Sequence, residues 1–210
     1  MHANDKDFSK SLYKIAIADP SDAEGIYNAL KSNLVEINDV DSLSEDQRRD
    51  LELNGFLRKK VDISYYLNLI NDNKTDIYIA INKENLIIGF ASIHKEQRDI
   101  YDLRSTLEIL HIVDQKIKEL LVNKESEFIY LDQISILTEY KRKRIATRLM
   151  KAILKNNKNP IVAFIVKEPL DNKASALWHA YNGFELVGTA DGHYKGKLFQ
   201  WYIYIHWNKG

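Results

Sequence analysis

The pattern of hydrophobic and polar positions divides the chain into strand-like and helix-like segments. Residues 198–207 show the clearest strand pattern, because Phe199, Trp201 and Ile203 alternate with more polar neighbours at the period of two of a half-buried strand. Residues 161–166 are almost wholly apolar, which is typical of a strand buried on both faces. Strands are expected at 12–18, 77–81, 86–93, 128–137, 161–166, 184–187 and 198–207.

Helices are expected where apolar residues recur at helical spacing. After residue 144, one face carries Ile145, Ala146, Leu149, Met150, Ile153 and Leu154. Helices are expected at 19–34, 44–53, 62–69, 103–122, 145–155 and 172–182. This mixed order predicts an α/β or α+β fold, with a sheet that carries helices on its faces. Since no Gly, Ser or Pro-rich linker divides the chain, we expect a single domain over 12–210, preceded by a disordered tail at 1–11.

Composition limits the classes of function. Thirty basic residues balance thirty acidic ones, which argues against bulk nucleic-acid binding, and the absence of cysteine excludes disulfides, thiolate zinc sites and a cysteine nucleophile. Residues 1–11 lack the apolar run of a signal peptide, and no segment is long and apolar enough to cross a membrane. We expect a cytoplasmic protein without a metal, membrane or nucleic-acid partner.

Four consecutive basic residues, 141–144, stand between the strand at 128–137 and the helix that begins at Ile145. A helix N-terminus carries partial positive charge and unpaired N–H groups, so it favours anions over cations. Cations at this position make sense if a polyanion binds there, and a strand, a tight loop and a helix N-terminus together form a phosphate site. The alternative is a solvated surface patch.

Two sequence motifs resemble those of the GNAT family of acyl-CoA-dependent N-acetyltransferases. Residues 138–150 are similar to the family's cofactor loop, and Asn172-x-x-Ser175 through 183–188 is similar to its next helix and strand. Residues 88–90 are similar to its hairpin strand, and the resemblance covers 75–207 well and 12–74 loosely. It implies a mixed, mostly antiparallel sheet with splayed middle strands and helices on both faces, acetyl-CoA as co-substrate, and an amine acceptor.

The resemblance also implies a set of cofactor-binding residues. Backbone groups of the strand end would bind the pantetheine arm, and N–H groups of 142–146 would bind the pyrophosphate. The implied residues are Ile136, Leu137, Thr138, Lys141, Arg142, Lys143, Arg144, Ile145, Ala146, Thr147 and Asn172. Asn172 is alternatively an ordinary helix N-cap.

Arg144 departs from the family pattern, because it stands where a glycine usually lets the backbone approach the pyrophosphate. The backbone can still surround the pyrophosphate if φ of Arg144 stays negative. The arginine side chain then either contacts a phosphate or points to solvent. Lys141 replaces the usual Gln or Arg, which is a mild change.

His179 occupies the position of the tyrosine that often serves the family as general acid. A free histidine is mostly neutral at pH 7, so this role needs a raised pKa; the alternative is a polar surface histidine. Tyr181 is the other candidate on this helix. Two residues turn a helix by about 200°, so Tyr181 cannot take the place of His179 on one face, and we expect it to pack in the core with Leu177 and Trp178.

Asp132 is the best candidate for a general base, on one strand face with Tyr130. Alternatively, Asp132 pairs with a lysine, and water alone assists direct attack. Candidates for acceptor contacts are His94, Glu96 and Tyr101. The alternative is that these three residues only form a solvated strand end and loop. We expect the late aromatic residues to form sheet core and a dimer edge, with a substrate pocket as the alternative: Trp201, Tyr202, Tyr204 and Trp207.

Three functions are compatible with these observations. The first is an N-acetyltransferase that transfers acetyl from acetyl-CoA to a primary amine by direct attack in a ternary complex. The second is a catalytically weak CoA-binding module on the same fold, which Arg144 and the missing tyrosine favour. The third is a protein that binds RNA or another polyanion through the basic loop. The sequence does not identify the acceptor, which is a small molecule or a protein. It also does not decide whether the protein forms a homodimer.

Overall fold

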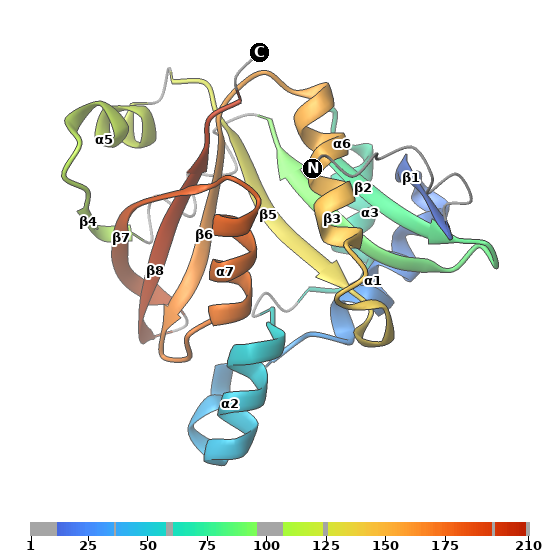
Figure 1. The fold of residues 1–210 in the computed structure, drawn as a ribbon, viewed down its shortest axis with the longest axis horizontal. Coiled ribbons are helices and arrows are strands. Elements are labelled where there is room, and N and C mark those ends of the chain that lie inside the picture. Colours follow the sequence, from blue (N-terminus) through green and yellow to red (C-terminus); the bar gives the residue numbers. More distant parts are fainter. Residues whose placement is uncertain are drawn as a thin grey trace, which may run out of the picture.

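The computed structural model describes residues 12–35, 37–57, 61–95, 107–123, 126–194 and 196–208, so the expected tail at 1–11 lies outside the described residues. The described strands form a sheet in the order β1-β2-β3-β5-β6-β8-β7-β4 (Figure 1). The strands are β1 (Tyr13–Ile17), β2 (Thr75–Asn82), β3 (Ile87–His94), β4 (Leu107–His111), β5 (Ile129–Ile136), β6 (Ile161–Glu168), β7 (Glu185–Tyr194) and β8 (Lys197–His206). Neighbouring strands are antiparallel except for the parallel pair β5 and β6. The expected α/β class is confirmed.

Helices cover both faces of the sheet. They are α1 (Ala23–Lys31), α2 (Glu45–Asn54), α3 (Ile63–Asn71), α5 (Gln115–Val122), α6 (Ile145–Asn156) and α7 (Lys173–Tyr181). In Figure 1, α6 and α7 lie in front of the sheet, and α1 and α3 lie behind it. The predicted apolar stripe of α6 is buried against β3, β5 and β6, including Ile145, Leu149 and Ile153. On the other face, Ile26 and Leu30 of α1 and Tyr66 of α3 pack against Phe90 of β3.

The middle of the sheet splays, as the resemblance implied. β5 and β6 pair only at Ile129 with Ile161 and at Tyr130 with Val162, although both described strands continue well beyond these pairs. On its other edge, β5 is bulged, because Gln133 pairs with Ser92 while Leu131 pairs with Ile93. Asp132 is therefore the extra residue of the bulge. A bulge next to a gap bends the strand and re-aims its side chains.

The long helix expected at 103–122 is wrong. Leu107–His111 is instead strand β4 at the sheet edge, α5 begins at Gln115, and 103–106 lie outside the described residues. Asp114 starts the helix, because its carboxylate accepts from the N–H groups of Lys116 and Ile117. The short strand expected at 184–187 extends to Tyr194 and pairs with β4. Gly188 permits this pairing, since a Cβ there would lie 2.4 Å from the His111 carbonyl oxygen.

Candidate functional site

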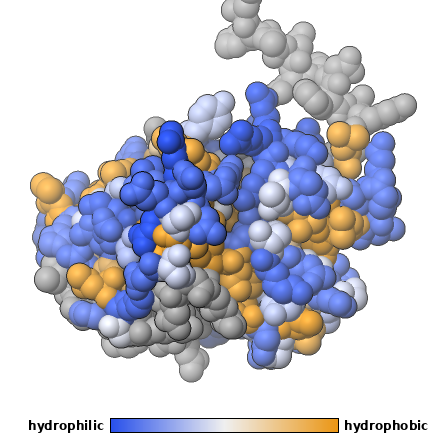
Figure 2. All heavy atoms as spheres, turned by 90° about the horizontal axis from the view of Figure 1, so that it is seen from below, coloured by the Kyte–Doolittle hydropathy of each residue, from blue (hydrophilic) through white to orange (hydrophobic). Residues whose placement is uncertain are grey.

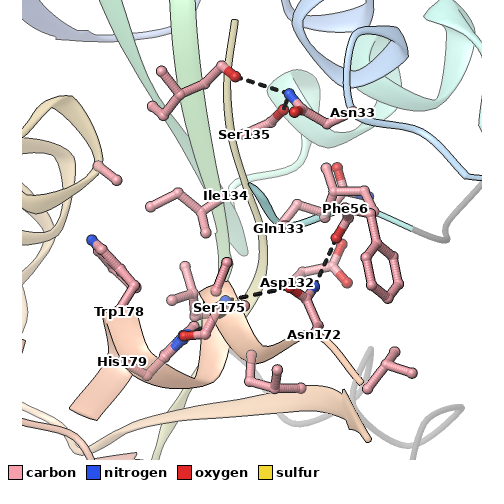
Figure 3. Close-up of a pocket in the computed structure, with 18 of the residues that line it drawn as sticks. Asn33, Phe56, Asp132, Gln133, Ile134, Ser135, Asn172, Ser175, Trp178 and His179 are labelled. Atoms are coloured by element: carbon pink, nitrogen blue, oxygen red, sulfur yellow. Dashed lines mark hydrogen bonds between the residues drawn. The ribbon is translucent and has the colours of Figure 1, made fainter. Parts of the chain in front are cut away.

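A cleft of about 950 Å³ opens where β5 and β6 diverge. Its walls come from both strands, from α3, α7 and β8, and from the loop before α6. Figure 3 shows residues 132–135 of β5 passing between Asn33 on one side and the side chains of α7 on the other. Seen from the side of α2, hydrophobic side chains gather in the middle of a largely hydrophilic surface (Figure 2).

The basic loop has an unusual backbone. Arg142 and Arg144 adopt the left-handed conformation, with φ values of 62° and 60°. The condition of a negative φ at Arg144 is therefore not met; the arginine keeps the conformation that glycine adopts most easily. Turns of this kind direct successive N–H groups toward one concave point, which suits an anion.

The N-terminus of α6 also lacks a side-chain cap. The described N-cap residues of α2, α3, α5 and α7 each accept a hydrogen bond from the first turn of their helix, whereas that of α1 does not. Within the described chain, the N–H groups of 142–144 find no backbone acceptor either. The loop and helix start therefore present a set of donors at one end of the cleft.

Among the described residues, two of the four basic side chains donate hydrogen bonds to another part of the protein. The ammonium group of Lys141 donates to the carbonyl oxygen of Asn54 at 3.0 Å, and the guanidinium of Arg142 donates to its Oδ1 at 3.3 Å. Asn54 ends α2, and a helix C-terminus attracts cations. Burial lowers the pKa of Lys141, and the nearby carboxylate of Asp50 opposes that shift.

The other basic side chains differ in position. The ammonium of Lys143 lies 4.8 Å from the ring centre of Tyr140, whereas Arg144 lines the cleft with Lys141 and Arg142. The cleft lining includes eight of the expected cofactor residues: Ile136, Lys141, Arg142, Arg144, Ile145, Ala146, Thr147 and Asn172. Leu137, Thr138 and Lys143 are not part of it, and the Leu137 N–H donates to Ile88 of β3.

Asn33 holds the end of β5, and no local sequence pattern pointed to it. Its Nδ2 lies 2.9 Å from the Ile136 carbonyl oxygen and 2.8 Å from Ser135 Oγ, which in turn donates to Ala29 (Figure 3). The side chain of Asn33 is buried at the end of α1, more than a hundred residues away in the sequence. This network ties α1 to the strand edge at the cleft.

Asn172 is a helix N-cap, which was the alternative to a cofactor contact. Its Oδ1 accepts from the Ser175 N–H at 3.3 Å, and its Nδ2 donates to the Phe56 carbonyl oxygen at 2.9 Å (Figure 3). The residue therefore caps α7 and fixes the loop after α2. Its position in the cleft wall also leaves it beside any bound ligand.

His179 is a core residue. It is only 1% exposed, its Nδ1 donates to the Ser175 carbonyl oxygen at 2.7 Å, and its ring packs edge-on against Phe184. Burial lowers its pKa to about 4, and the bond to Ser175 opposes this only in part. The raised pKa that an acid at this position needs is absent, and the surface alternative is also wrong. Within the described chain, Nε2 is buried without a hydrogen-bond partner.

Tyr181 lies on the opposite side of α7. It is 84% exposed and reaches the cleft mouth, and Leu177 is 69% exposed. The expected rotation between positions 179 and 181 is confirmed, but the expected packing of Tyr181 and Leu177 in the core is wrong. The apolar members of this helix that do pack inward are Ala176 and Trp178.

Asp132 belongs to a polar cluster on the α3 side of the sheet. Its Oδ2 lies 3.5 Å from His94 Nε2 and accepts a hydrogen bond from the Tyr65 hydroxyl at 3.2 Å. The side chains of His94 and Asp132 are 6% and 7% exposed, and all three residues line the cleft. Tyr65 comes from α3, within the helix expected at 62–69. Glu96 and Tyr101 lie outside the described residues.

The late aromatic residues divide between the core and the cleft. Tyr204 is core, and Trp207 donates to the Glu185 carboxylate. Trp201 lines the cleft, as expected if the late aromatic residues contribute to a substrate pocket. Among the described residues, no group of three or more histidine or carboxylate side chains is placed to hold a metal ion. None of the described helices is long and apolar enough to span a bilayer.

Comparison with known proteins identifies the class. The family model described as "Acetyltransferase (GNAT) family" matches residues 40–184. This chain belongs to the GNAT acetyltransferase family. No curated protein sequence matches the chain.

Solved structures share the fold at low sequence identity. Arabidopsis thaliana NAA60 in complex with acetyl-CoA is 15% identical, with a TM-score of 0.57 over 93% of this chain and 99% of that chain. The ribosomal-protein-S18-alanine N-acetyltransferase from Escherichia coli is 9% identical, with a TM-score of 0.56 over 92% of each chain. The PaiA N-acetyltransferase from Thermoplasma acidophilum in complex with coenzyme A is 14% identical, with a TM-score of 0.53 over 92% of this chain and 98% of that chain.

Proposed function

We propose that this protein transfers an acetyl group from acetyl-CoA to a primary amine, by direct attack in a ternary complex. The observation that carries the proposal is the cleft between β5 and β6, which is continuous with the left-handed loop and the uncapped N-terminus of α6. Two structures of the same fold are complexes with acetyl-CoA and coenzyme A. A cytoplasmic location without a nucleic-acid or membrane partner is part of the proposal, in keeping with the balanced charge.

The cofactor is proposed to bind through backbone groups. The N–H groups of 142–146 bind the pyrophosphate, and the β6-facing edge of β5 at Ile134 and Ile136, where Asn33 already bonds the Ile136 carbonyl oxygen, binds the pantetheine amides in the manner of an added strand. Lys141 and Arg142 exchange Asn54 for phosphate oxygens, because a charge-assisted bond to phosphate is stronger than a bond to a neutral carbonyl.

Asp132 is proposed as the base that receives the proton of the amine, directly or through water. The Tyr65 hydroxyl fixes its carboxylate, and His94 lies beside it. The amine nitrogen attacks the thioester carbonyl, the C–N bond forms, the C–S bond breaks, and the departing thiolate is protonated from water or from the Tyr181 hydroxyl at the cleft mouth. His179 is neutral at pH 7 and its one N–H is bonded to the Ser175 carbonyl oxygen, so it is not an acid for the thiolate and we assign it to packing of α7.

The test is a thiol-release assay with acetyl-CoA and a set of primary amines, combined with thermal unfolding. We expect acetyl-CoA to raise the melting temperature and at least one amine to release free coenzyme A. Stabilisation without turnover of any amine would favour the second candidate, a CoA-binding module, to which Arg144 and the buried His179 point. Stabilisation by an oligonucleotide, but not by coenzyme A, would contradict both.

A further inference from the structure

A row of aromatic rings crosses the sheet on the face that carries Asp132. The His94 ring of β3 stacks on Tyr130 of β5 at 5.9 Å between centroids, and Tyr130 meets Phe164 of β6 edge-on at 6.1 Å. The row spans the place where β5 and β6 separate, since their pairing ends at Tyr130 and Val162. All three rings line the cleft.

The row continues onto β8. Phe199 and Trp201 stack at 5.5 Å between centroids, and Phe164 and Val166 pack against them. These side chains also line the cleft, and Leu69 of α3 faces it from the helix side. This part of the cleft is therefore walled by flat apolar groups.

The charged side chains of the cleft lining are separated along the chain. Lys141, Arg142 and Arg144 line the cleft from the loop that follows β5, whereas Asp132 lies within β5, on the aromatic face. The second carboxylate of the lining, Asp72, accepts from the Lys74 N–H in its own turn. A phosphorylated co-substrate is drawn to the basic loop, and an ammonium group is drawn to Asp132 and repelled by the arginines.

We propose that the acceptor is a primary amine attached to an apolar, preferably aromatic, group that lies on the His94–Tyr130–Phe164 row with its nitrogen at Asp132. This inference rests on the proposed acetyltransferase function and names its acceptor class. Polyamines and amino sugars fit poorly, because their second charge or hydroxyl groups would be buried against apolar walls without partners. Aromatic groups also gain from edge-on and stacked contacts with the row.

The experiment compares two primary amines of similar basicity, 2-phenylethylamine and ethanolamine, with spermidine and glucosamine as polar competitors. We expect kcat/KM for 2-phenylethylamine to exceed that of the others by about 10-fold or more, as for apolar groups in apolar pockets. Phe164→Ala should reduce this ratio toward one. Phe164→Leu, which keeps an apolar wall and disturbs the fold less, should give an intermediate ratio.

A binding measurement makes the test independent of turnover. Calorimetric titration of the CoA-loaded protein should give tighter binding of 2-phenylethylamine than of ethanolamine. A short peptide with N-terminal phenylalanine forms a further arm: acetylation of the peptide in preference to the free amine would identify a chain terminus as the source of the same chemistry.

The outcomes separate the two claims. If spermidine, glucosamine or ethanolamine is preferred, or if Phe164→Ala leaves the ratio unchanged in a folded protein, the acceptor class is wrong while acetyltransfer stands. If coenzyme A does not bind and no amine is acetylated, the proposed function itself fails.

Discussion

The buried His179 makes the stability of this protein sensitive to acid in a predictable way. The folded protein holds the imidazole neutral, with its one N–H bonded to the Ser175 carbonyl oxygen. Its pKa is lowered from 6.5 to about 4 by burial. In the unfolded chain the same side chain is hydrated and takes up a proton at its ordinary pKa.

The sign and size follow from proton linkage. Between pH 6.5 and about 4, the unfolded chain binds a proton at His179 that the folded protein does not bind, so the free energy of unfolding falls as the pH falls. Each unit of difference in pKa corresponds to about 1.4 kcal/mol, so this one group removes about 2 kcal/mol of stability between pH 7 and pH 5 and about 3 kcal/mol by pH 4.

The assay is urea unfolding of the wild type and of His179→Phe at pH 7, 6 and 5. At pH 7 we expect the variant to be less stable by about 1 kcal/mol, because it loses the hydrogen bond to Ser175. Toward pH 5 the variant should lose less stability than the wild type, by about 2 kcal/mol. Burial also lowers the pKa of His206 and raises that of Asp171, but these shifts are common to both proteins and cancel in the difference.

A stability difference that stays constant from pH 7 to pH 5 would refute this reasoning. It would mean that His179 is not held as a neutral, desolvated ring, and the acid role that the sequence suggested would then return.

Three further predictions concern the loop and the base. Arg144→Gly should unfold with a free energy about 1 kcal/mol higher than Arg144→Ala, because only glycine adopts φ near 60° without a steric cost; equal values in urea unfolding would show that the position is not left-handed. Arg142→Glu should weaken coenzyme A binding by about 10-fold or more in calorimetry, while Lys151→Glu, an exposed charge reversal on α6, should leave it within about 2-fold; equal effects would point to net charge rather than to a site. Asp132→Asn should lower kcat/KM at pH 7 by about 100-fold or more, with partial recovery as rising pH deprotonates the amine; an unchanged pH profile would remove Asp132 from the proton transfer.

The periodicity of the sequence predicted those elements whose packing follows one simple face. The stripe of α6 and the alternation of β8 depend on neighbours a few residues away, so both were right. Over 103–122, the spacing of the leucines was compatible with one long helix and equally with a strand followed by a helix. Pairing with β7 decided the matter for 107–111, and that contact joins residues far apart in the chain.

The site was predicted only in part, for the same reason. The loop at 141–146 is local and could be read from its motif, whereas Asn33 and Tyr65 reach the cleft from distant helices and gave no local signal. The left-handed φ of Arg144 could not be foreseen, because arginine normally avoids it. The burial of His179 depends on Phe184 and Tyr204, which the fold brings over α7.

A crystal structure of this protein with coenzyme A would show directly whether the cleft binds the cofactor. We expect the pyrophosphate on the N–H groups of 142–146 and the pantetheine arm between β5 and β6, bonded to the edge of β5 near Ile134 and Ile136. Coenzyme A bound elsewhere, or a cleft left vacant at saturating coenzyme A, would contradict this expectation.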